Sequence, residues 1–314
     1  MSDLKGIGNI NGVTCYINTT LQCLGNLQRF KAFVLLNKRP GIVIESLKDV
    51  YDCLYVKKRD VVPNRFIKDL QGALKYIEIL NENDLNEFIV SLLDHIHNEI
   101  CITNTYTVPL REISNKFEYL KYNLDVAWHK QNKHISKIID IFYGQHVIQT
   151  QCSVCKHICH NYEPFSNMML PVPDDANTLQ ECLKKHFTIE EINDWKCDKC
   201  ENKANNQKSI KLWRVPEVLV IALNRFHSVT NGGAHKVCKT ITAPLYLDLS
   251  KYNLNSKGEY RLKSIANHYG NLHGGHYNSF LNINQSWYFA DDMHTAKLDT
   301  IRFDNAYMFF YESL

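Results

Sequence analysis

A cysteine near the start of the chain, followed at once by a helical pattern, is the feature that most limits how this sequence folds. Cys15 comes after a glycine-containing turn at Gly12. Hydrophobic residues then recur with the spacing of one helix face, at Ile17, Leu21 and Leu24. This pattern predicts a helix whose first turn carries the sulfur, where free N–H groups and the helix dipole favour a thiolate. Such a position suits a nucleophile, although a buried structural cysteine is the alternative.

A second chemical signal lies at the other end of the chain, in a predicted β-hairpin. A short polar segment, 282–286, separates two runs rich in aromatic and aliphatic residues. With the turn centred on 283–284, His276 lies opposite Asp291, within reach of a hydrogen bond, and a shift of the turn by one residue moves that partner by two. The pattern predicts a base, His276, oriented by Asp291 or Asp292. Spacing alone leaves three rival bases open: His268, His273 and His294.

These two segments resemble the two signature boxes of the ubiquitin-specific protease family of papain-like cysteine proteases. The second box is the run Gly-Gly-His-Tyr at 274–277. Between the boxes, residues 83–88 (Asn-Asp-Leu-Asn-Glu-Phe) resemble the family's Gln-Asp-x-x-Glu-Phe helix start, with Asn in place of Gln. Residues 219–226 resemble its buried strand ending in Arg-Phe, and residues 306–311 its closing strand. The resemblance covers essentially the whole chain in the family's order.

The hydrophobic pattern changes near residue 138. Residues 1–137 are predicted to be mostly helical, with a polar, mobile connection over 104–137, and residues 138–314 hold short β-rich runs. Together with the resemblance, this implies an α+β fold and a single catalytic domain over 1–314. The helical part is the thumb, the β-rich part is the palm, and zinc-ribbon fingers are inserted around 145–215. The active site is expected at the boundary between the two parts.

The resemblance assigns catalytic roles to residues at both ends of the chain. It implies that Cys15 is the nucleophile and His276 the general base. Asp291 orients the imidazole, because the family's W-x-x-x-D-D pattern places the orienting residue at the first Asp after Trp287. Asp292 either polarises a water or substitutes for Asp291.

Further residues are expected to bind the substrate. Asp84 and Glu87 lie one helical turn apart, and the resemblance places this acidic pair near the arginines of ubiquitin's C-terminal tail. Helix capping explains Asp84 equally well. Gly274 and Gly275 either leave a narrow passage that admits only a Gly-Gly tail or form a flexible turn. By the same resemblance, Tyr277 contacts the substrate.

The loop before the cysteine departs from the family pattern. The family writes Gly-Leu-x-Asn-x-Gly-x-Thr-Cys, and its Asn helps to hold the oxyanion. This chain is one residue longer there, and Ile10 stands five residues before Cys15. Either Asn9 reaches the oxyanion through a bulged loop or Asn11 substitutes, with the backbone N–H of Cys15 as a further donor. Asn9 is preferred, because the run that begins at Gly6 preserves the family's order.

Four cysteines form two Cys-x-x-Cys pairs, Cys152 with Cys155 and Cys197 with Cys200, separated by 41 residues. Two such turns complete a tetrahedral zinc site, and four protein ligands leave no open position, so the metal is expected to be structural. Two unrelated surface turns or a redox pair are the alternative. The resemblance places such a zinc ribbon at the tip of the fingers. Competing ligands with less suitable spacing are His157, Cys159 and His160.

Composition limits the environment and the partners. The 314 residues are 45% hydrophobic, enough for a large core. The net charge of +3 is too small to indicate nucleic-acid binding. No hydrophobic segment follows the first five residues, and the longest apolar run, near 218–223, is too short to span a membrane. Eleven cysteines, an odd number, favour reduced thiols in the cytoplasm or nucleus.

The resemblance therefore implies a zinc-containing deubiquitinase, a thiol isopeptidase that cuts after the C-terminal glycine of ubiquitin. Its partners are ubiquitin and ubiquitinated proteins, with neither nucleic acid nor membrane. A catalytically silent ubiquitin-binding scaffold with an altered oxyanion loop is one alternative. A protease for another ubiquitin-like modifier is a second alternative, and nothing in the sequence separates ubiquitin from its relatives.

Overall fold

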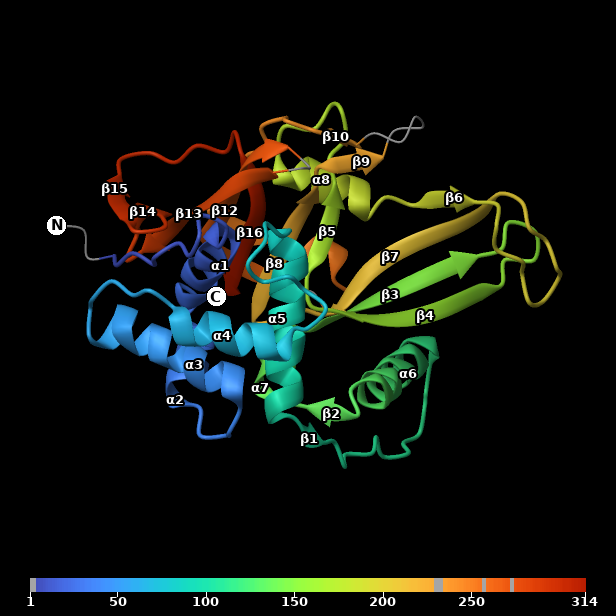
Figure 1. Ribbon diagram of the computed structural model, residues 1–314. Helices are drawn as coiled ribbons and strands as arrows, with labels where there is room; N and C mark the ends of the chain where they lie inside the picture. Colours follow the sequence, from blue (N-terminus) through green and yellow to red (C-terminus); the bar gives the residue numbers. More distant parts are fainter. Residues whose placement is uncertain (1–3, 229–233, 256–257, 272–273) are drawn as a thin grey trace.

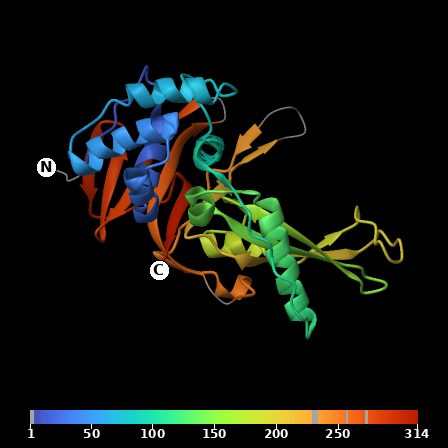
Figure 2. The ribbon, with the colours of Figure 1, turned by 90° about the horizontal axis from the view of Figure 1, so that it is seen from below.

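Helices occupy the first part of the chain in the computed structural model, which describes residues 4–228, 234–255, 258–271 and 274–314. Five of them pack together beside the large sheet (Figures 1 and 2). They are α1 (Cys15–Gly25), α2 (Gln28–Leu36), α3 (Ile42–Tyr51), α4 (Asn64–Ala73) and α5 (Leu85–Ile100). A π-helical turn, η1 (Asp52–Val56), extends α3. Within the described ranges, no helix combines the length and hydrophobicity that a membrane crossing needs.

The first helix, α1, lies between the large sheet and the other helices. Every one of its residues is buried, including the polar Asn18 and Gln22. It packs on strands β12 (Glu259–Asn271) and β13 (Gly274–Ile283). The buried side chains of Asn18 and Gln22 donate hydrogen bonds through their amide nitrogens. The packing of α1 on β13 brings Cys15 next to the backbone of Tyr277 in the C-terminal hairpin.

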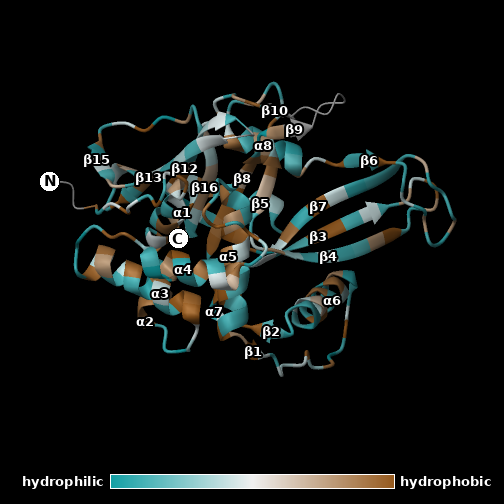
Figure 3. Cartoon of the chain, in the orientation of Figure 1, coloured by the Kyte–Doolittle hydropathy of each residue, from teal (hydrophilic) through white to brown (hydrophobic). Residues whose placement is uncertain are grey.

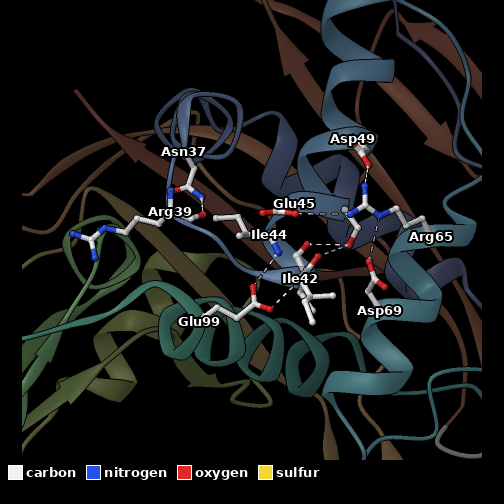
Figure 4. Close-up of polar contacts among 11 residues, drawn as sticks. Asn37, Arg39, Ile42, Ile44, Glu45, Asp49, Arg65, Asp69 and Glu99 are labelled. Carbon is white, nitrogen blue, oxygen red and sulfur yellow. Dashed lines mark hydrogen bonds and ion pairs between the residues drawn. The ribbon is translucent and has the colours of Figure 1, made fainter.

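Polar contacts join the outer helices. Glu99 of α5 accepts hydrogen bonds from the backbone N–H groups of Val43 and Ile44, 2.9 and 3.1 Å away, and so caps the start of α3 (Figure 4). On the facing surface of α3 and α4, Arg65 pairs with three carboxylates, those of Glu45, Asp49 and Asp69 (Figure 4). The cap satisfies otherwise free N–H groups, whereas the exposed ion pairs contribute little.

A large mixed sheet forms the other half of the core. Its strand order is β15-β14-β13-β12-β16-β8-β5, with β11 (Tyr246–Asp248) paired to β12. The bounds not yet given are β15 (His294–Leu298), β14 (Ser286–Asp291), β16 (Ala306–Ser313), β8 (Val218–Asn224) and β5 (Met168–Pro171). All pairs are antiparallel except β5 with β8.

Strand β8 shows why the sheet is buried on both faces. Val218, Val220 and Ala222 join the core beneath the helices. The alternate residues join a second core on the opposite face: Leu219, Ile221 and Leu223. A strand covered on both sides is continuously hydrophobic, as Figure 3 shows along β8. The second core also receives α8 (Leu179–His186).

A smaller sheet of four strands, β4-β3-β7-β6, extends away from the body of the molecule (Figure 1). Its strands are β3 (Gly144–Gln151), β4 (Ile158–Phe165), β6 (Glu190–Ile192) and β7 (Asn206–Arg214). The loops that follow β3 and β6 contain the four cysteines of the Cys-x-x-Cys pairs. Two minor pairings complete the strands: β1 (Ile102–Thr103) with β2 (His134–Ile135), and β9 (Phe226–Ser228) with β10 (Ala234–Lys236).

Two expectations about the middle of the chain are wrong. The segment 104–137 contains a helix, α6 (Lys116–Gln131), whose start is capped by Asn115. Only Leu124 of this helix is buried, so its hydrophobic period is weak. The β-rich texture also begins later than residue 138, because Ser136 caps a further helix, α7 (Lys137–Phe142). Its run of isoleucines has strand propensity, but the cap and the burial of its apolar side chains favour a helical turn.

Candidate active site

A cleft of about 370 Å³ lies where the helices meet the large sheet. Its walls come from the start of α1, the loop before α5, and strands β8 and β13. The lining residues include five of the residues that the sequence analysis assigns to catalysis or substrate binding: Cys15, Asp84, Gly274, Gly275 and Tyr277. The structure thus brings together residues that are more than 250 positions apart in the chain.

Cys15 is the first residue of α1, as the sequence predicts, and is 3% exposed. Burial raises the pKa of its thiol, and the carboxylates of Asp292 and Glu82 raise it further. Backbone N–H groups of Tyr277 and Tyr16 act in the opposite direction but do not prevail. The expectation of a preformed thiolate is therefore wrong for the free protein, because desolvation outweighs the helix start. A nearby base must remove the proton.

His276 and Asp291 are in direct contact. The Nε2 atom of His276 lies 2.5 Å from Oδ1 of Asp291. This contact leaves the other ring nitrogen, Nδ1, available to exchange a proton. A carboxylate on one nitrogen of an imidazole fixes the ring orientation and the tautomer, and it stabilises the imidazolium once a proton arrives.

The hairpin register differs from the centred turn of the prediction. The turn residues are Asn284 and Gln285, both with positive φ (48° and 68°), and Ile283 pairs with Ser286. The turn therefore sits one residue further along, and the position directly opposite His276 moves by two. Since side chains alternate with a period of two, Asp291 stays on the same face as His276 and reaches it diagonally.

Asp292 is held by a separate network. Its carboxylate accepts hydrogen bonds from Nδ2 of Asn9 (2.8 Å) and Nδ2 of Asn18 (2.7 Å). Its carbonyl accepts one from the backbone N–H of Ile7, 2.9 Å away. Asp292 has positive φ (51°) just after β14, which turns its side chain toward the loop before α1. Both aspartates thus lie near His276, but it is Asp291 that holds the imidazole.

Asn9 and Asn11 occupy different environments. The Oδ1 atom of Asn9 accepts hydrogen bonds from the backbone N–H and the hydroxyl of Thr14, at 2.9 and 3.1 Å. Asn11 is exposed, with φ of 55°, and is followed by Gly12 with φ of 74°. The inserted residue is accommodated in a turn that bulges outward, so Asn9 points inward and Asn11 toward solvent.

Of the three rival histidines, His268 lines the same cleft, His294 is not among the lining residues, and His273 lies outside the described residues. His268 is buried and stacks on Tyr277 with ring centroids 4.6 Å apart. Burial, together with the charge of Lys236, lowers the pKa of His268 to about 4, so its imidazole is neutral at pH 7. His294 is exposed at the start of β15. His273 is the one outside the described ranges.

Asp84 serves two purposes. One carboxylate oxygen caps α5 by accepting the backbone N–H of Glu87 (3.0 Å), and the other accepts the hydroxyl of Tyr307 (2.8 Å) inside the cleft. The capping explanation is therefore right in part, but the same carboxylate also lines the cleft. Glu87 is on the first turn of α5 and does not line the cleft. The hydroxyl of Tyr277 lies 3.5 Å from the backbone nitrogen of Leu85, against the same helix start.

The two glycines of the second box lie in strand β13. A Cβ atom on Gly275 would lie 2.3 Å from the carbonyl oxygen of Tyr269 and 2.4 Å from Nε2 of His268. Only glycine fits there without movement of the backbone, so this residue is not a free turn. Both glycines line the cleft, where they leave space beside the cysteine.

The four cysteines of the Cys-x-x-Cys pairs, here called the four-cysteine cluster, meet at one point. Their Sγ atoms lie within 4.8 Å of one another, with Cys152 3.4 Å from Cys200 and Cys155 3.6 Å from Cys197. Each pair sits on a tight turn closed by a residue of positive φ, the first at position 156 and the second at position 201. This arrangement can hold a metal ion, since four sulfur ligands at such spacing suit tetrahedral coordination. All eleven cysteines lie within the described residues, and each is a free thiol.

Two residues of the site were missed by the sequence reasoning. Asn18 lies one helical turn after Cys15 on a helix that is buried all round, and a polar residue on a buried face is a usable signal. Glu82 lines the cleft and influences Cys15. Nothing in the sequence distinguishes Glu82 from an ordinary loop carboxylate.

Comparisons with known proteins agree with this geometry. A family model described as ubiquitin carboxyl-terminal hydrolase matches residues 6–311. The chain therefore belongs to the ubiquitin carboxyl-terminal hydrolase family, and the resemblance drawn from the two signature boxes is confirmed.

Individual relatives and solved structures show the extent of the similarity. Ubiquitin carboxyl-terminal hydrolase 4 of Eremothecium gossypii is 27% identical, over 98% of this chain and 42% of the relative. Ubiquitin carboxyl-terminal hydrolase 5 of Saccharomyces cerevisiae is 30% identical, over 99% of this chain and 45% of the relative. The chain thus spans about two fifths of the length of such relatives.

A similar solved structure is that of the SAGA Ubp8/Sgf11/Sus1/Sgf73 DUB module bound to ubiquitin aldehyde. It matches with a TM-score of 0.79 and 20% identity, over 99% of this chain and 70% of that chain. This similarity confirms the α+β fold class expected from the sequence.

Proposed function

We propose that this chain is the catalytic domain of a deubiquitinase, a thiol-dependent hydrolase that cuts the bond after the C-terminal glycine of ubiquitin. The observation that carries the proposal is the meeting of two groups at the start of α1. The Cys15 thiol is close enough to the backbone of Tyr277 and to the carboxylate of Asp292 for both to affect its pKa. Asp292 in turn clusters with the hydrogen-bonded His276–Asp291 pair. Membership of the ubiquitin carboxyl-terminal hydrolase family supports ubiquitin and ubiquitinated proteins as the partners.

In the first half of the proposed reaction, Nδ1 of His276 takes the proton of the Cys15 thiol as the sulfur attacks the carbonyl carbon of the terminal glycine. The raised pKa of the thiol makes this proton transfer necessary rather than optional. The imidazolium, stabilised by Asp291, then donates its proton to the departing lysine amine as the carbon–nitrogen bond breaks, leaving a thioester.

In the second half, His276 takes a proton from water, whose oxygen attacks the thioester carbonyl. The carbon–sulfur bond breaks, the sulfur regains a proton from His276, and ubiquitin leaves with a free carboxylate. We assign the oxyanion donors to the backbone N–H of Cys15 and the side-chain amide of Asn9. The support for Asn9 is its inward position, since one of its amide hydrogens already binds Asp292 and the other remains for the oxyanion.

We assign the substrate-facing surface to Asp84, Glu87, Gly274, Gly275 and Tyr277. Four of these residues line the cleft, and Glu87 is on the first turn of α5, one turn from Asp84. Two carboxylates beside a passage walled by glycines suit a tail that ends in two glycines and carries cationic residues before them.

We further propose that the four-cysteine cluster holds a structural zinc ion. When bound, the zinc supplies a cross-link between the loops at the end of the small sheet and takes no part in the hydrolysis. The donor set of four thiols favours zinc over oxygen-preferring cations.

The experiment that tests the proposed function compares the unaltered protein with Cys15→Ala, His276→Ala and Asp291→Ala on a ubiquitin C-terminal amide. Cys15→Ala and His276→Ala should abolish cleavage, and Asp291→Ala should lower kcat. Cys15→Ala should still bind ubiquitin. A fully folded protein that binds ubiquitin but never cleaves it would instead support the scaffold alternative.

A further inference from the structure

The loop between α4 and α5 places one carboxylate across the cleft. Oε2 of Glu82 accepts a hydrogen bond from the backbone N–H of Gly275, 3.2 Å away. A Cβ atom on Gly274 would lie 3.0 Å from the same oxygen. Glu82 therefore lies directly over the two glycines and connects the helical part of the molecule to strand β13.

The donor that Glu82 occupies is one that an extended peptide would use. Gly275 precedes His276 in β13, and its backbone N–H faces the cleft that contains Cys15. Proteins commonly bind extended peptides through backbone groups of this kind at a strand. A carboxylate oxygen on this N–H takes the place of a peptide carbonyl, so the tail and Glu82 compete for the same donor.

The described walls of the cleft offer Glu82, which is exposed, no cationic partner. Among the described lining residues, Arg225 is the only permanent cation, and its guanidinium is buried. It already donates to the carbonyls of Ala306, Val237 and Lys239. Glu82 therefore has no cation to pair with on the described walls of the cleft. A cationic side chain on an incoming tail would supply that partner.

We propose that Glu82 is a specificity-determining gate residue, which closes the tail passage by binding the Gly275 N–H in the free protein. The inference deepens the proposed function and rests on it in one respect, namely that the occupant of the cleft is a peptide tail. A tail opens the gate when one of its carbonyls takes the Gly275 N–H and one of its basic side chains pairs with the displaced carboxylate. A tail without a basic residue displaces the same carboxylate without gaining an ion pair, and therefore enters less readily.

The test uses two electrophiles that alkylate Cys15 and need no ubiquitin. Iodoacetamide is small enough to bypass the passage, whereas a Gly-Gly chloromethyl ketone must lie along it. In both, the thiolate forms a carbon–sulfur bond and halide leaves. The rate ratio of the dipeptide reagent to iodoacetamide cancels any change in the reactivity of the thiol itself, which matters because Glu82 also affects the pKa of Cys15.

Glu82→Ala should raise this ratio about fivefold, the loss expected for one exposed charge-assisted hydrogen bond. Glu82→Gln keeps the size and an acceptor oxygen but not the charge, so it should raise the ratio about twofold. Asp94→Ala is the matched control, because it removes an exposed carboxylate from α5 far along the helix. Its ratio should equal that of the unaltered protein.

An unchanged ratio in Glu82→Ala, or an equal rise in Asp94→Ala, would overturn the gate. If the rate ratio rises in Glu82→Ala as expected but the unaltered protein does not cleave ubiquitin, the gate is retained and the proposed function is refuted. Cleavage of ubiquitin together with an unchanged rate ratio in Glu82→Ala would retain the proposed function and refute the gate. Mapping the alkylated peptide by mass separates Cys15 from the other cysteines in each case.

Discussion

Replacement of Asn9 by alanine tests how the longer loop before Cys15 supports catalysis. Asn9 contacts Thr14 through Oδ1 and Asp292 through Nδ2, and the substitution removes both contacts. Its Oδ1 atom accepts the backbone N–H and the hydroxyl of the fully buried Thr14. Loss of that acceptor leaves a buried N–H unsatisfied, which should destabilise the fold by about 1–3 kcal/mol.

The side-chain amide, which donates to Asp292, is also the group that we assign to the oxyanion. If the amide of Asn9 donates to the oxyanion, Asn9→Ala should lower kcat by about 10²–10³. Asn11→Gly provides the control, because it removes the other asparagine side chain at a position whose φ of 55° suits glycine. This variant should keep both its melting temperature and its kcat.

The assay is the steady-state cleavage of a fluorogenic ubiquitin C-terminal amide, measured well below the melting temperature and normalised to titrated active sites. The normalisation separates the loss of folded protein from the loss of turnover. A normalised kcat for Asn9→Ala within about threefold of the unaltered protein would refute the oxyanion role, since one such donor is worth far more. A large loss of normalised kcat in Asn11→Gly would instead assign the oxyanion role to Asn11.

Three further predictions concern other parts of the structure. Removal of the metal from the four-cysteine cluster by a chelator should loosen the small sheet, which would be detected as faster amide hydrogen exchange in β3 and β7 but not in α1. A metal-free protein with unchanged amide exchange would refute a structural zinc. Asp84→Ala combined with Glu87→Ala should raise KM for ubiquitin more than it lowers kcat, whereas a lower melting temperature with unchanged kinetics would leave capping as their only role. Burial, together with the neighbouring His186, lowers the pKa of His146 to about 4. In the unfolded chain the imidazole of His146 takes up a proton from about pH 6.5 downward, whereas in the folded protein it does so only near pH 4. The free energy of unfolding should therefore fall by about 2–3 kcal/mol between pH 7 and pH 4.5 because of His146. His146→Phe keeps the stacking on Phe165 and should reduce this fall in the free energy of unfolding, measured by urea unfolding at the two pH values. An equal fall in the variant and the unaltered protein would exclude His146 as its cause.

The sequence predicted the elements that have strong local signals. The helix that begins at Cys15 and the helix that begins after Asp84 follow from their hydrophobic spacing and their start residues. The four-cysteine cluster follows from its two Cys-x-x-Cys turns, because such turns pre-form half of a site each. The hairpin was placed to within one residue, and the period of two kept Asp291 on the correct face despite that shift.

The remainder depended on packing between distant segments, which local patterns do not encode. Helix α6 buries only Leu124, so its amphipathic signal was too weak to separate it from a loop. The raised pKa of Cys15 results from burial beneath the sheet and from Glu82 and Asp292, which lie far from it in sequence. The holding of Asp292 by Asn9 and Asn18 likewise exists only after the hairpin packs on the start of α1.

The most direct test of the central proposal is to incubate the protein with ubiquitin that bears a C-terminal electrophile and to map the modified residue by mass. We predict one covalent adduct, on Cys15, which His276→Ala slows and Cys15→Ala prevents. Parallel probes made from other ubiquitin-like modifiers should react more slowly. An adduct on another cysteine would contradict the assignment of the nucleophile, and a faster reaction with another modifier would contradict ubiquitin as the substrate.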